Sequence, residues 1–129
     1  MLPIKIKLVN LGRVEREFRE IIGEYERRLK SMAHLRFSTK ISPEAILIDE
    51  YGEEMSTEQF QSLLMDYSKN GKEIEFAIGP PEGFLEEMKM KHRKISLSRL
   101  TLRHEIAYLV LLEQIYRVLL RLRGTKYEK

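Results

Sequence analysis

The chain of 129 residues contains no cysteine, no tryptophan and only three histidines. Without cysteine there are no disulfides, no thiolate nucleophiles and no zinc or iron–sulfur sites built on thiolates. None of the histidines stands four residues from another, the spacing that places two ligands on one helix face, so we expect no metal site. A reaction that needs neither a protein thiolate nor a metal is therefore expected.

Long apolar runs are also missing. No window approaches the roughly 18 consecutive apolar residues of a membrane helix, and residues 1–5 lack the charged and apolar regions of a signal peptide. We therefore expect a cytoplasmic protein. The hydrophobic fraction of 43% and charged fraction of 33% suit a chain with a buried core. The length fits a single domain over residues 1–129.

Charge is unevenly distributed although the net charge is only +3. Residues 1–43 carry 10 basic and 5 acidic side chains, residues 44–85 carry 2 and 10, and residues 86–129 carry 11 and 5. If the outer thirds meet in space, they form a basic face suited to a polyanion such as nucleic acid. The alternative is that these charges lie on ordinary solvated helix faces.

Hydrophobic periodicity predicts alternating strands and helices. The expected strands cover residues 4–10, 35–41, 45–49, 73–78 and 95–98. The expected helices cover residues 13–31, 57–69, a short segment from about 84, and 102–122. Ser56 and Gln59 have the spacing of a capping box, and a turn is expected at residues 50–52. This alternation predicts an α/β domain with a mainly parallel sheet flanked by helices.

The last predicted helix is apolar on every side between Ile106 and Leu112. A helix that covers only one sheet face needs a single apolar stripe, so a second burying surface is expected.

Ligands of parallel sheets bind beyond the carboxyl ends of the strands, where three loops are expected to meet: residues 49–52, 79–83 and 98–102. Nucleotide-hydrolase, dinucleotide, esterase and zinc-peptidase motifs are absent, whereas methyl transfer from a sulfonium donor needs mainly positioning. Each candidate residue also has a structural alternative. Residues 79–83 could form a simple turn, and Asp49 could cap one. Ser96, Ser98 and Thr101 could cap the last helix, and His104 could be structural.

The segment from Ile95 to Arg117 resembles the S-L-S-x-x-T-L-x-H…L-L-x-E-Q-I-Y-R signature of one family. That family is the SPOUT-class ribosomal RNA large subunit methyltransferases H, which act on pseudouridine. Weaker matches to the same family occur in the family's order along the chain, at residues 48–52, 56–60, 78–83 and 123–127, so the resemblance spans nearly the whole chain.

The resemblance implies a C-terminal trefoil knot, a homodimer and S-adenosylmethionine as cofactor. It carries the cofactor-binding role over to nine residues: Ile48, Gly79, Pro80, Leu97, Ser98, Arg99, Leu100, Thr101 and Leu102. A partner subunit would be the second burying surface of the last helix, in contact with Leu109, Leu112 and Tyr116.

Basic residues follow the last helix into the tail, and with Arg13 and Arg16 they are expected to bind RNA phosphates around the pocket. They are Arg117, Arg121, Arg123, Lys126 and Lys129.

The chain departs from the family pattern in three places. Pro80 replaces a glycine and supplies no amide donor, so only its carbonyl could contact a cofactor. Between His34 and Glu44 a strand and helix of fuller family members are expected to be missing. Lys126 and Glu128 replace a proline and a histidine of the tail, and we expect Glu128, from the same or the partner subunit, to act as the base or to position it, with Tyr127 packed on the substrate ring. The alternative is that the last residues are a solvated end without a catalytic role.

The expected function is therefore S-adenosylmethionine-dependent methylation of a pseudouridine ring nitrogen in large-subunit ribosomal RNA. The alternatives are a SPOUT-fold RNA-binding dimer without catalysis and a methyltransferase with another RNA target.

Overall fold

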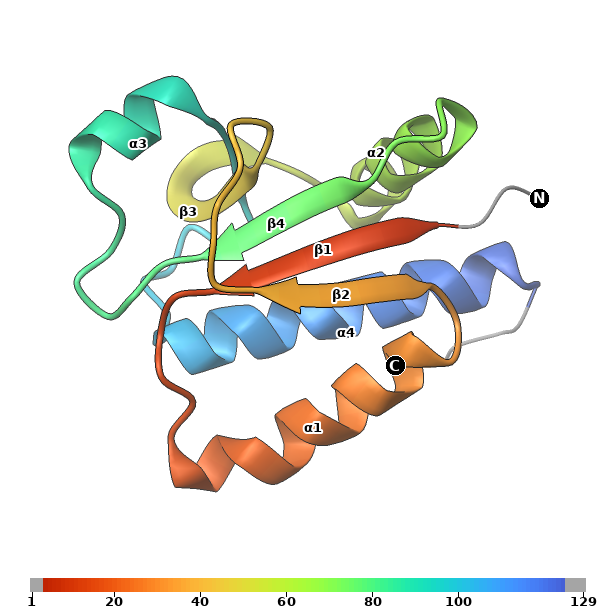
Figure 1. Cartoon of the computed structure of the whole chain (residues 1–129), viewed down its shortest axis with the longest axis horizontal. Coiled ribbons are helices and arrows are strands. Elements are labelled where there is room, and N and C mark those ends of the chain that lie inside the picture. The colour runs from red at the N-terminus through yellow and green to blue at the C-terminus, as the bar shows by residue number, and fades with distance from the viewer. Residues whose placement is uncertain (1–3, 125–129) are drawn as a thin grey trace.

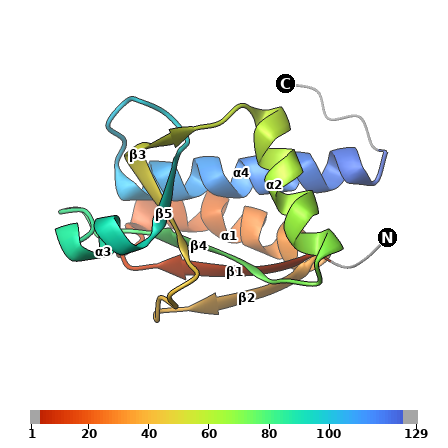
Figure 2. The ribbon, with the colours of Figure 1, turned by 90° about the horizontal axis from the view of Figure 1, so that it is seen from above.

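A computed structural model describes residues 4–124 and places five strands in one sheet, in the order β2-β1-β4-β3-β5 (Figures 1 and 2). All four strand pairings are parallel, which confirms the predicted α/β fold. The strands are β1 Lys5–Asn10, β2 His34–Ser38, β3 Ile46–Glu54, β4 Ile74–Ile78 and β5 Arg93–Ser96. The helices are α1 Arg16–Lys30, α2 Thr57–Lys69, α3 Glu86–Lys91 and α4 His104–Leu122.

Local signals explain the best-predicted helix, α2. The Ser56 hydroxyl accepts a hydrogen bond from the Gln59 amide at 3.1 Å, and the Gln59 side chain accepts one from the Ser56 amide at 2.8 Å. This capping box satisfies two of the amides that a helix start leaves without partners. The predicted start of the helix is confirmed.

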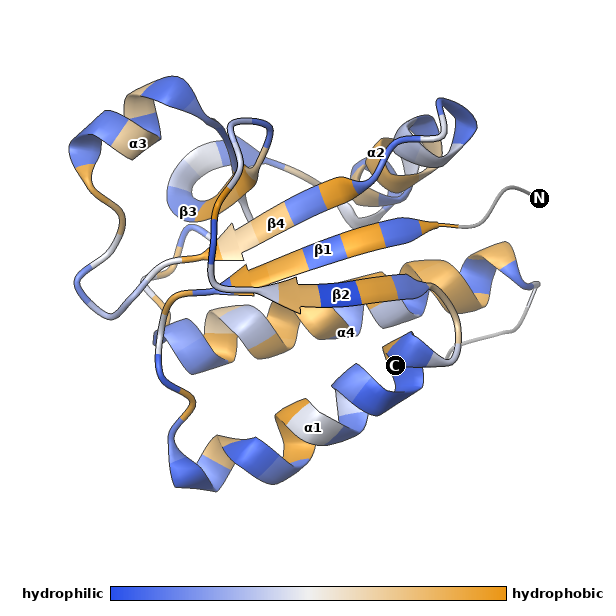
Figure 3. Cartoon of the chain, in the orientation of Figure 1, coloured by the Kyte–Doolittle hydropathy of each residue, from blue (hydrophilic) through white to orange (hydrophobic). Residues whose placement is uncertain are grey.

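Three helices cover one face of the sheet. Alternate side chains of β1 and β4, among them Ile6, Leu8 and Phe76, pack against α1, α2 and α4 in the main core. Figure 1 shows α1 and α4 side by side below the strands, and Figure 3 shows the apolar residues of the strands and of α4. The two basic thirds of the sequence therefore meet, at the contact of α1 with α4.

Elements of the same chain cover the helix α4 on several sides. It packs on the sheet and also against α1 and α2. Leu112 is 0% exposed, and the Tyr116 ring meets the Tyr25 ring edge-on at 5.7 Å. Part of the second burying surface lies within the chain, and Leu112 has no accessible surface left for the expected contact with a partner subunit. Leu109 and Tyr116 stay partly exposed, and their contact with a partner stays a prediction.

The opposite face of the sheet has a smaller cover. A second cluster of Val9, Leu47, Ala77 and Phe84 lies there, with Ile41 and Met88 packed against it. Beside this cluster the face is polar, because Lys7 and Glu75 are buried together with 3.3 Å between Nζ and Oε1.

The strand β3 is longer than predicted. Residues 50–52, expected as a turn that ends the strand, are part of it: after Ile48 the pairing with β5 is interrupted, and it resumes at Glu53 and Glu54 with a shifted register. Gly52 permits this resumed pairing, since a Cβ there would lie 2.6 Å from the main-chain carbonyl carbon of Lys94. Among residues 4–124, no helix is long and apolar enough to cross a membrane.

Candidate functional site

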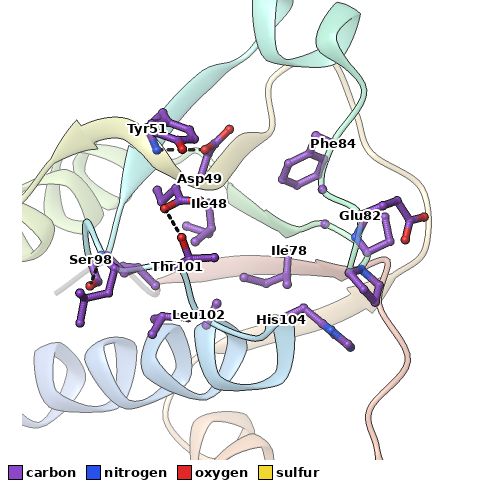
Figure 4. A pocket seen from close by; sticks show the side chains of 18 of the residues that line it. Ile48, Asp49, Tyr51, Ile78, Glu82, Phe84, Ser98, Thr101, Leu102 and His104 are labelled. Atoms are coloured by element: carbon purple, nitrogen blue, oxygen red, sulfur yellow. Dashed lines mark hydrogen bonds between the residues drawn. The ribbon is translucent and has the colours of Figure 1, made fainter.

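A pocket of about 270 Å³ lies at the carboxyl ends of β3, β4 and β5 (Figure 4). The loop within β3, the β4–α3 connection and the β5–α4 connection form its walls. These are the three loops that the parallel-sheet rule predicted to meet. The predicted convergence is confirmed.

The β3 wall contains Ile48, Asp49, Glu50 and Tyr51. The Asp49 carboxylate accepts a hydrogen bond from the Tyr51 amide at 3.0 Å, which closes the loop within the strand. The structural alternative for Asp49, a turn cap, is thus observed. Its other oxygen lies 3.8 Å from Nζ of Lys89, so this carboxylate also faces a cation.

The β4 wall runs from Ile78 to Phe84. The Pro80 carbonyl accepts a hydrogen bond from the Gly83 amide at 2.8 Å, and Gly83 has a φ of +85°, which glycine adopts without strain. A Cβ on Gly79 would lie 3.2 Å from the Phe84 ring, so the glycine lets the ring pack against the loop. The Pro80 carbonyl is therefore part of a tight turn.

The β5–α4 wall is organised by hydroxyl groups. The Ser96 hydroxyl donates to the Ser98 carbonyl at 2.8 Å, and the Ser98 hydroxyl accepts from the Leu100 amide at 3.0 Å. The Thr101 hydroxyl donates to the Glu50 carboxylate at 2.8 Å and so joins this wall to β3 (Figure 4). None of the three caps α4, whose N-cap residue is Arg103, so the capping alternative is wrong.

The base of the pocket is formed by the first turns of α4, where His104 and Ala107 line it. The neighbouring Glu105 is fully buried, and its Oε1 lies 3.4 Å from Nδ1 of His104. Burial favours a higher pKa for Glu105, but hydrogen bonds from the amides of Glu105 and Glu15 and the charges of His104 and Arg103 lower its pKa below the ordinary value. Glu105 is thus held as a carboxylate at the start of the helix, where the helix dipole favours negative charge.

The pocket lining combines apolar groups with excess negative charge. Ile48, Ile78, Leu97, Leu102 and Ala107 supply apolar surface. Three carboxylates line the pocket, those of Asp49, Glu50 and Glu82, whereas Lys89 supplies an ammonium group. Such a lining suits a ligand that has an apolar ring and a positive charge. Among residues 4–124 no group of three or more metal-ligating side chains occurs.

Eight of the nine residues predicted to bind a cofactor line this pocket. Arg99 does not, because its guanidinium points to Glu54, with 3.3 Å between Nη1 and Oε1. The binding roles stay predictions, whereas the placement of the eight residues is observed. Sequence reasoning missed Phe84 and Lys89 as lining residues, since the positions that follow the glycine-proline loop carry no motif of their own. It also missed Ala107 in the first turns of α4.

The residues predicted to bind RNA on α4 lie away from the pocket. Arg121 is 17 residues beyond His104, which is about 26 Å along a helix with a rise of about 1.5 Å per residue. Arg121 faces Glu58 at 3.2 Å, and Arg123 reaches the Ser31 carbonyl at 3.4 Å. Arg117 pairs with Glu113 at 2.7 Å. Within one chain these arginines do not surround the pocket, and Lys126, Tyr127, Glu128 and Lys129 lie outside the described residues.

Comparison with known proteins identifies the family. The family model described as "Predicted SPOUT methyltransferase" matches residues 38–128. The ribosomal RNA large subunit methyltransferase H of Thermotoga neapolitana is 34% identical over 127 residues, which cover 96% of this chain and 76% of that protein. A protein of the same name from Thermus thermophilus is 32% identical, with 98% of this chain and 99% of that protein covered.

Solved structures show the same fold at low sequence identity. TrmJ from Z. mobilis ZM4 superposes with a TM-score of 0.52 at 12% identity and covers 100% of this chain and 73% of that chain. Lpg2936 from Legionella pneumophila, solved with the bound cofactor SAM, gives a TM-score of 0.50 at 17% identity, with 89% of this chain and 66% of that chain covered. The family model and the curated relatives place this chain in the SPOUT methyltransferase family.

Proposed function

We propose that this protein transfers a methyl group to a ring nitrogen of a pseudouridine in large-subunit ribosomal RNA. As a SPOUT family member it is a methyltransferase that uses S-adenosylmethionine. Curated relatives at 32–34% identity over nearly the whole chain bear the name ribosomal RNA large subunit methyltransferase H. The observation that carries the proposal is the convergence of the three loops on one pocket.

The pocket fits the cofactor chemically. An adenine ring needs apolar walls, which Ile48, Leu97 and Leu102 offer, and main-chain groups that read its edge. The amides of Thr101 and Leu102 donate none of the hydrogen bonds found among residues 4–124, so they are free to do this. The carboxylates of the lining favour a cationic ligand over a neutral one.

The cofactor, when bound, supplies an activated methyl group on a sulfonium, whose sulfur keeps the electron pair of the broken bond. The protein must remove the proton from the ring nitrogen, since a protonated amide-type nitrogen has no free lone pair for the new bond. We assign this proton to Glu128, directly or through a group that it positions, with Tyr127 stacked on the substrate ring. A carboxyl group has an unperturbed pKa of about 4.3, so Glu128 needs burial in the complex to become an effective base.

We further propose that the protein is a homodimer joined at the rim of the pocket, with the trefoil knot that the family resemblance implies. Tyr51 and Leu100 line the pocket and are 79% and 71% exposed. Exposed apolar side chains of this size favour contact with another protein. A partner seated there would exclude water from the pocket and bring a second tail near it. Light scattering at micromolar concentration should give twice the 15.3 kDa of one chain, and Tyr51→Lys/Leu100→Lys should give the single chain.

Methylation of large ribosomal subunits with labelled S-adenosylmethionine tests the function. We expect label at one position, and none in subunits that carry uridine in place of pseudouridine there. Calorimetric titration should show S-adenosylmethionine binding to the wild type and not to Ala107→Phe, which fills the base of the pocket. Ser62→Phe, a bulky substitution on α2 away from the pocket, should bind normally.

Two tail variants test the assignment of the base. Single-turnover rates of Glu128→Gln and of a chain ending at Gly124 should fall by a factor of about 100 or more, the usual contribution of a general base. Wild-type rates in both variants would remove the tail from catalysis. Binding of the cofactor without methyl transfer to any RNA would favour the alternative of a noncatalytic RNA-binding protein.

A further inference from the structure

Three consecutive residues at the start of α4 hold the connection between β1 and α1 and the first turn of α1. Nε2 of His104 lies 2.6 Å from the carbonyl oxygen of Arg13. Oε2 of Glu105 accepts a hydrogen bond from the Glu15 amide at 3.3 Å. The Arg103 guanidinium lies 5.2 Å from the centre of the Phe18 ring. Residues about 90 positions apart in sequence are thus joined beside the pocket.

The contact of His104 with this connection is close. A Cβ on Gly12 would lie 2.2 Å from Cδ2 of His104, so only glycine lets the ring reach the Arg13 carbonyl. A carbonyl oxygen can only accept a hydrogen bond, so Nε2 of His104 carries a proton. The other ring nitrogen faces Glu105, whose Oε1 is buried and has no hydrogen-bond partner among residues 4–124. The ring is therefore held at Nε2 by the Arg13 carbonyl, has Glu105 as its neighbour at Nδ1, and also lines the pocket.

The connection held in this way presents two unpaired cations. Arg13 and Arg16 are exposed, and neither side chain has an ion-pair or hydrogen-bond partner among residues 4–124. The arginines at the far end of α4, in contrast, face Glu113, Glu58 or the Ser31 carbonyl. An unpaired guanidinium can form two parallel hydrogen bonds with a phosphate without first breaking an internal ion pair.

We infer that His104 is a positioning residue, which fixes the Arg13–Arg16 connection beside the pocket so that its two arginines hold backbone phosphates of the substrate RNA. The inference rests on the proposed function, because the pocket beside the arginines must be the one where RNA is methylated. It assigns the phosphate contacts nearest the reacting base to Arg13 and Arg16. It also explains why a glycine stands at position 12, since only a residue without a side chain lets His104 reach the Arg13 carbonyl.

Binding of the full-length protein to large ribosomal subunits over a range of salt concentrations tests the arginines. Each lost phosphate contact should reduce the slope of log affinity against log salt by about 0.7–0.9. We expect Arg13→Gln to weaken binding about five- to tenfold with a slope smaller by about one, and to raise the KM for subunits more than it lowers kcat. The Kd for S-adenosylmethionine should change less than about threefold, since Arg13 does not line the pocket.

A double-mutant cycle tests the positioning role. Gly12→Ala pushes the His104 ring away and should reproduce the binding loss of Arg13→Gln with both arginines present. His104→Ala should do the same, and Gly12→Ala/His104→Ala should be no weaker than His104→Ala alone, because the added methyl group no longer meets a ring. His104→Gln, whose amide can still donate to the Arg13 carbonyl, should recover most of the affinity. Gly23→Ala, at a glycine with open space around it, should match the wild type.

Wild-type binding and salt slope in Arg13→Gln, or full additivity of Gly12→Ala and His104→Ala, would overturn the inference. Thermal unfolding of each variant separates lost positioning from lost folding, since a folded variant with a reduced salt slope has lost phosphate contacts. If the proposed function is wrong, the wild type itself will transfer no methyl group to large subunits, and this result distinguishes that case from a wrong assignment of the arginines.

Discussion

The two faces of the sheet are stabilised in different ways. On the face covered by α1, α2 and α4, the side chains of β1 and β4 are apolar and fully buried, such as Ile6, Leu8 and Phe76. On the other face, the alternate positions of the same strands hold Lys7 and Glu75, also buried but joined as an ion pair. Parallel sheets are usually covered by helices on both faces. Here the second face has only the small apolar cluster around Val9, Leu47, Ala77 and Phe84. Beside this cluster, ion-paired side chains occupy positions at which the helix-covered face has apolar residues.

The cover of the polar face explains why its charges are tolerated. The Ser42 amide donates to Oε2 of Glu75 at 2.9 Å, and the Ser42 hydroxyl donates to the other carboxylate oxygen. Glu75 is therefore satisfied by Lys7 and by the loop that lies over it. Near the edge of the same face, Arg36 holds Glu73 with two hydrogen bonds of 2.7 and 2.8 Å. A buried charge costs little only when such partners are in place.

The largest effect is expected on the helix-covered face. Phe76→Ala removes a fully buried ring whose centre lies 5.5 Å from that of Phe60. The free energy of unfolding should fall by about 3–5 kcal/mol. Urea denaturation measures this, with Leu85→Ala as control, since Leu85 is 68% exposed and should change stability by less than about 0.5 kcal/mol. A loss below about 1 kcal/mol for Phe76→Ala would contradict the importance of this face.

An intermediate effect is expected on the polar face. Glu75→Gln leaves Lys7 buried without its carboxylate and should cost about 3 kcal/mol of unfolding free energy. Lys7→Met/Glu75→Leu removes both charges and should be about as stable as the wild type or more stable. The same denaturation measurements compare the two variants. A double variant that is less stable than Glu75→Gln would show that the ion pair stabilises the protein more than an apolar pair at the same positions. It would contradict the expectation that this face merely tolerates its buried charges.

The smallest effect is expected at the edge of the polar face. Arg36→Gln should cost less than about 1 kcal/mol, since the Arg36 side chain is 60% exposed. The hydrogen bond from Arg36 lowers the pKa of Glu73 below its ordinary value and outweighs burial, which would raise it. A carboxylate with a lowered pKa in the folded state stabilises the protein above its unfolded pKa of about 4.3 and stops doing so as the pH falls through the folded value.

The difference in stability between the wild type and Arg36→Gln should therefore be constant from about pH 5 to about pH 8 and disappear in more acidic solution. Thermal unfolding from about pH 8 down to below about pH 4 is the measurement. Glu73→Gln should remove the same dependence, and a double variant should show no further loss. A difference that grows toward acidic pH would show that another group is responsible.

Much of the fold follows from local patterns. The alternation of strands and helices predicted the parallel sheet, and Ser56 with Gln59 fixed the start of α2. Helix starts without such caps were less accurate: α1 begins at Arg16 and α4 at His104, both later than expected. Their N-cap residues, Glu15 and Arg103, make no side-chain capping bond, so nothing local marks the boundary.

The sequence by itself determined the order of strands and helices, the parallel sheet and, through the rule for its carboxyl ends, the meeting of three loops at a pocket. Only the tertiary structure decided which surfaces cover α4, since a stripe of apolar residues shows that a helix is buried but not by what. The tertiary structure also decided that Gly12 lies against His104 and that Gly52 lies against β5. Both are contacts between segments that are distant in sequence. A glycine in a sequence does not show which neighbouring group it leaves room for.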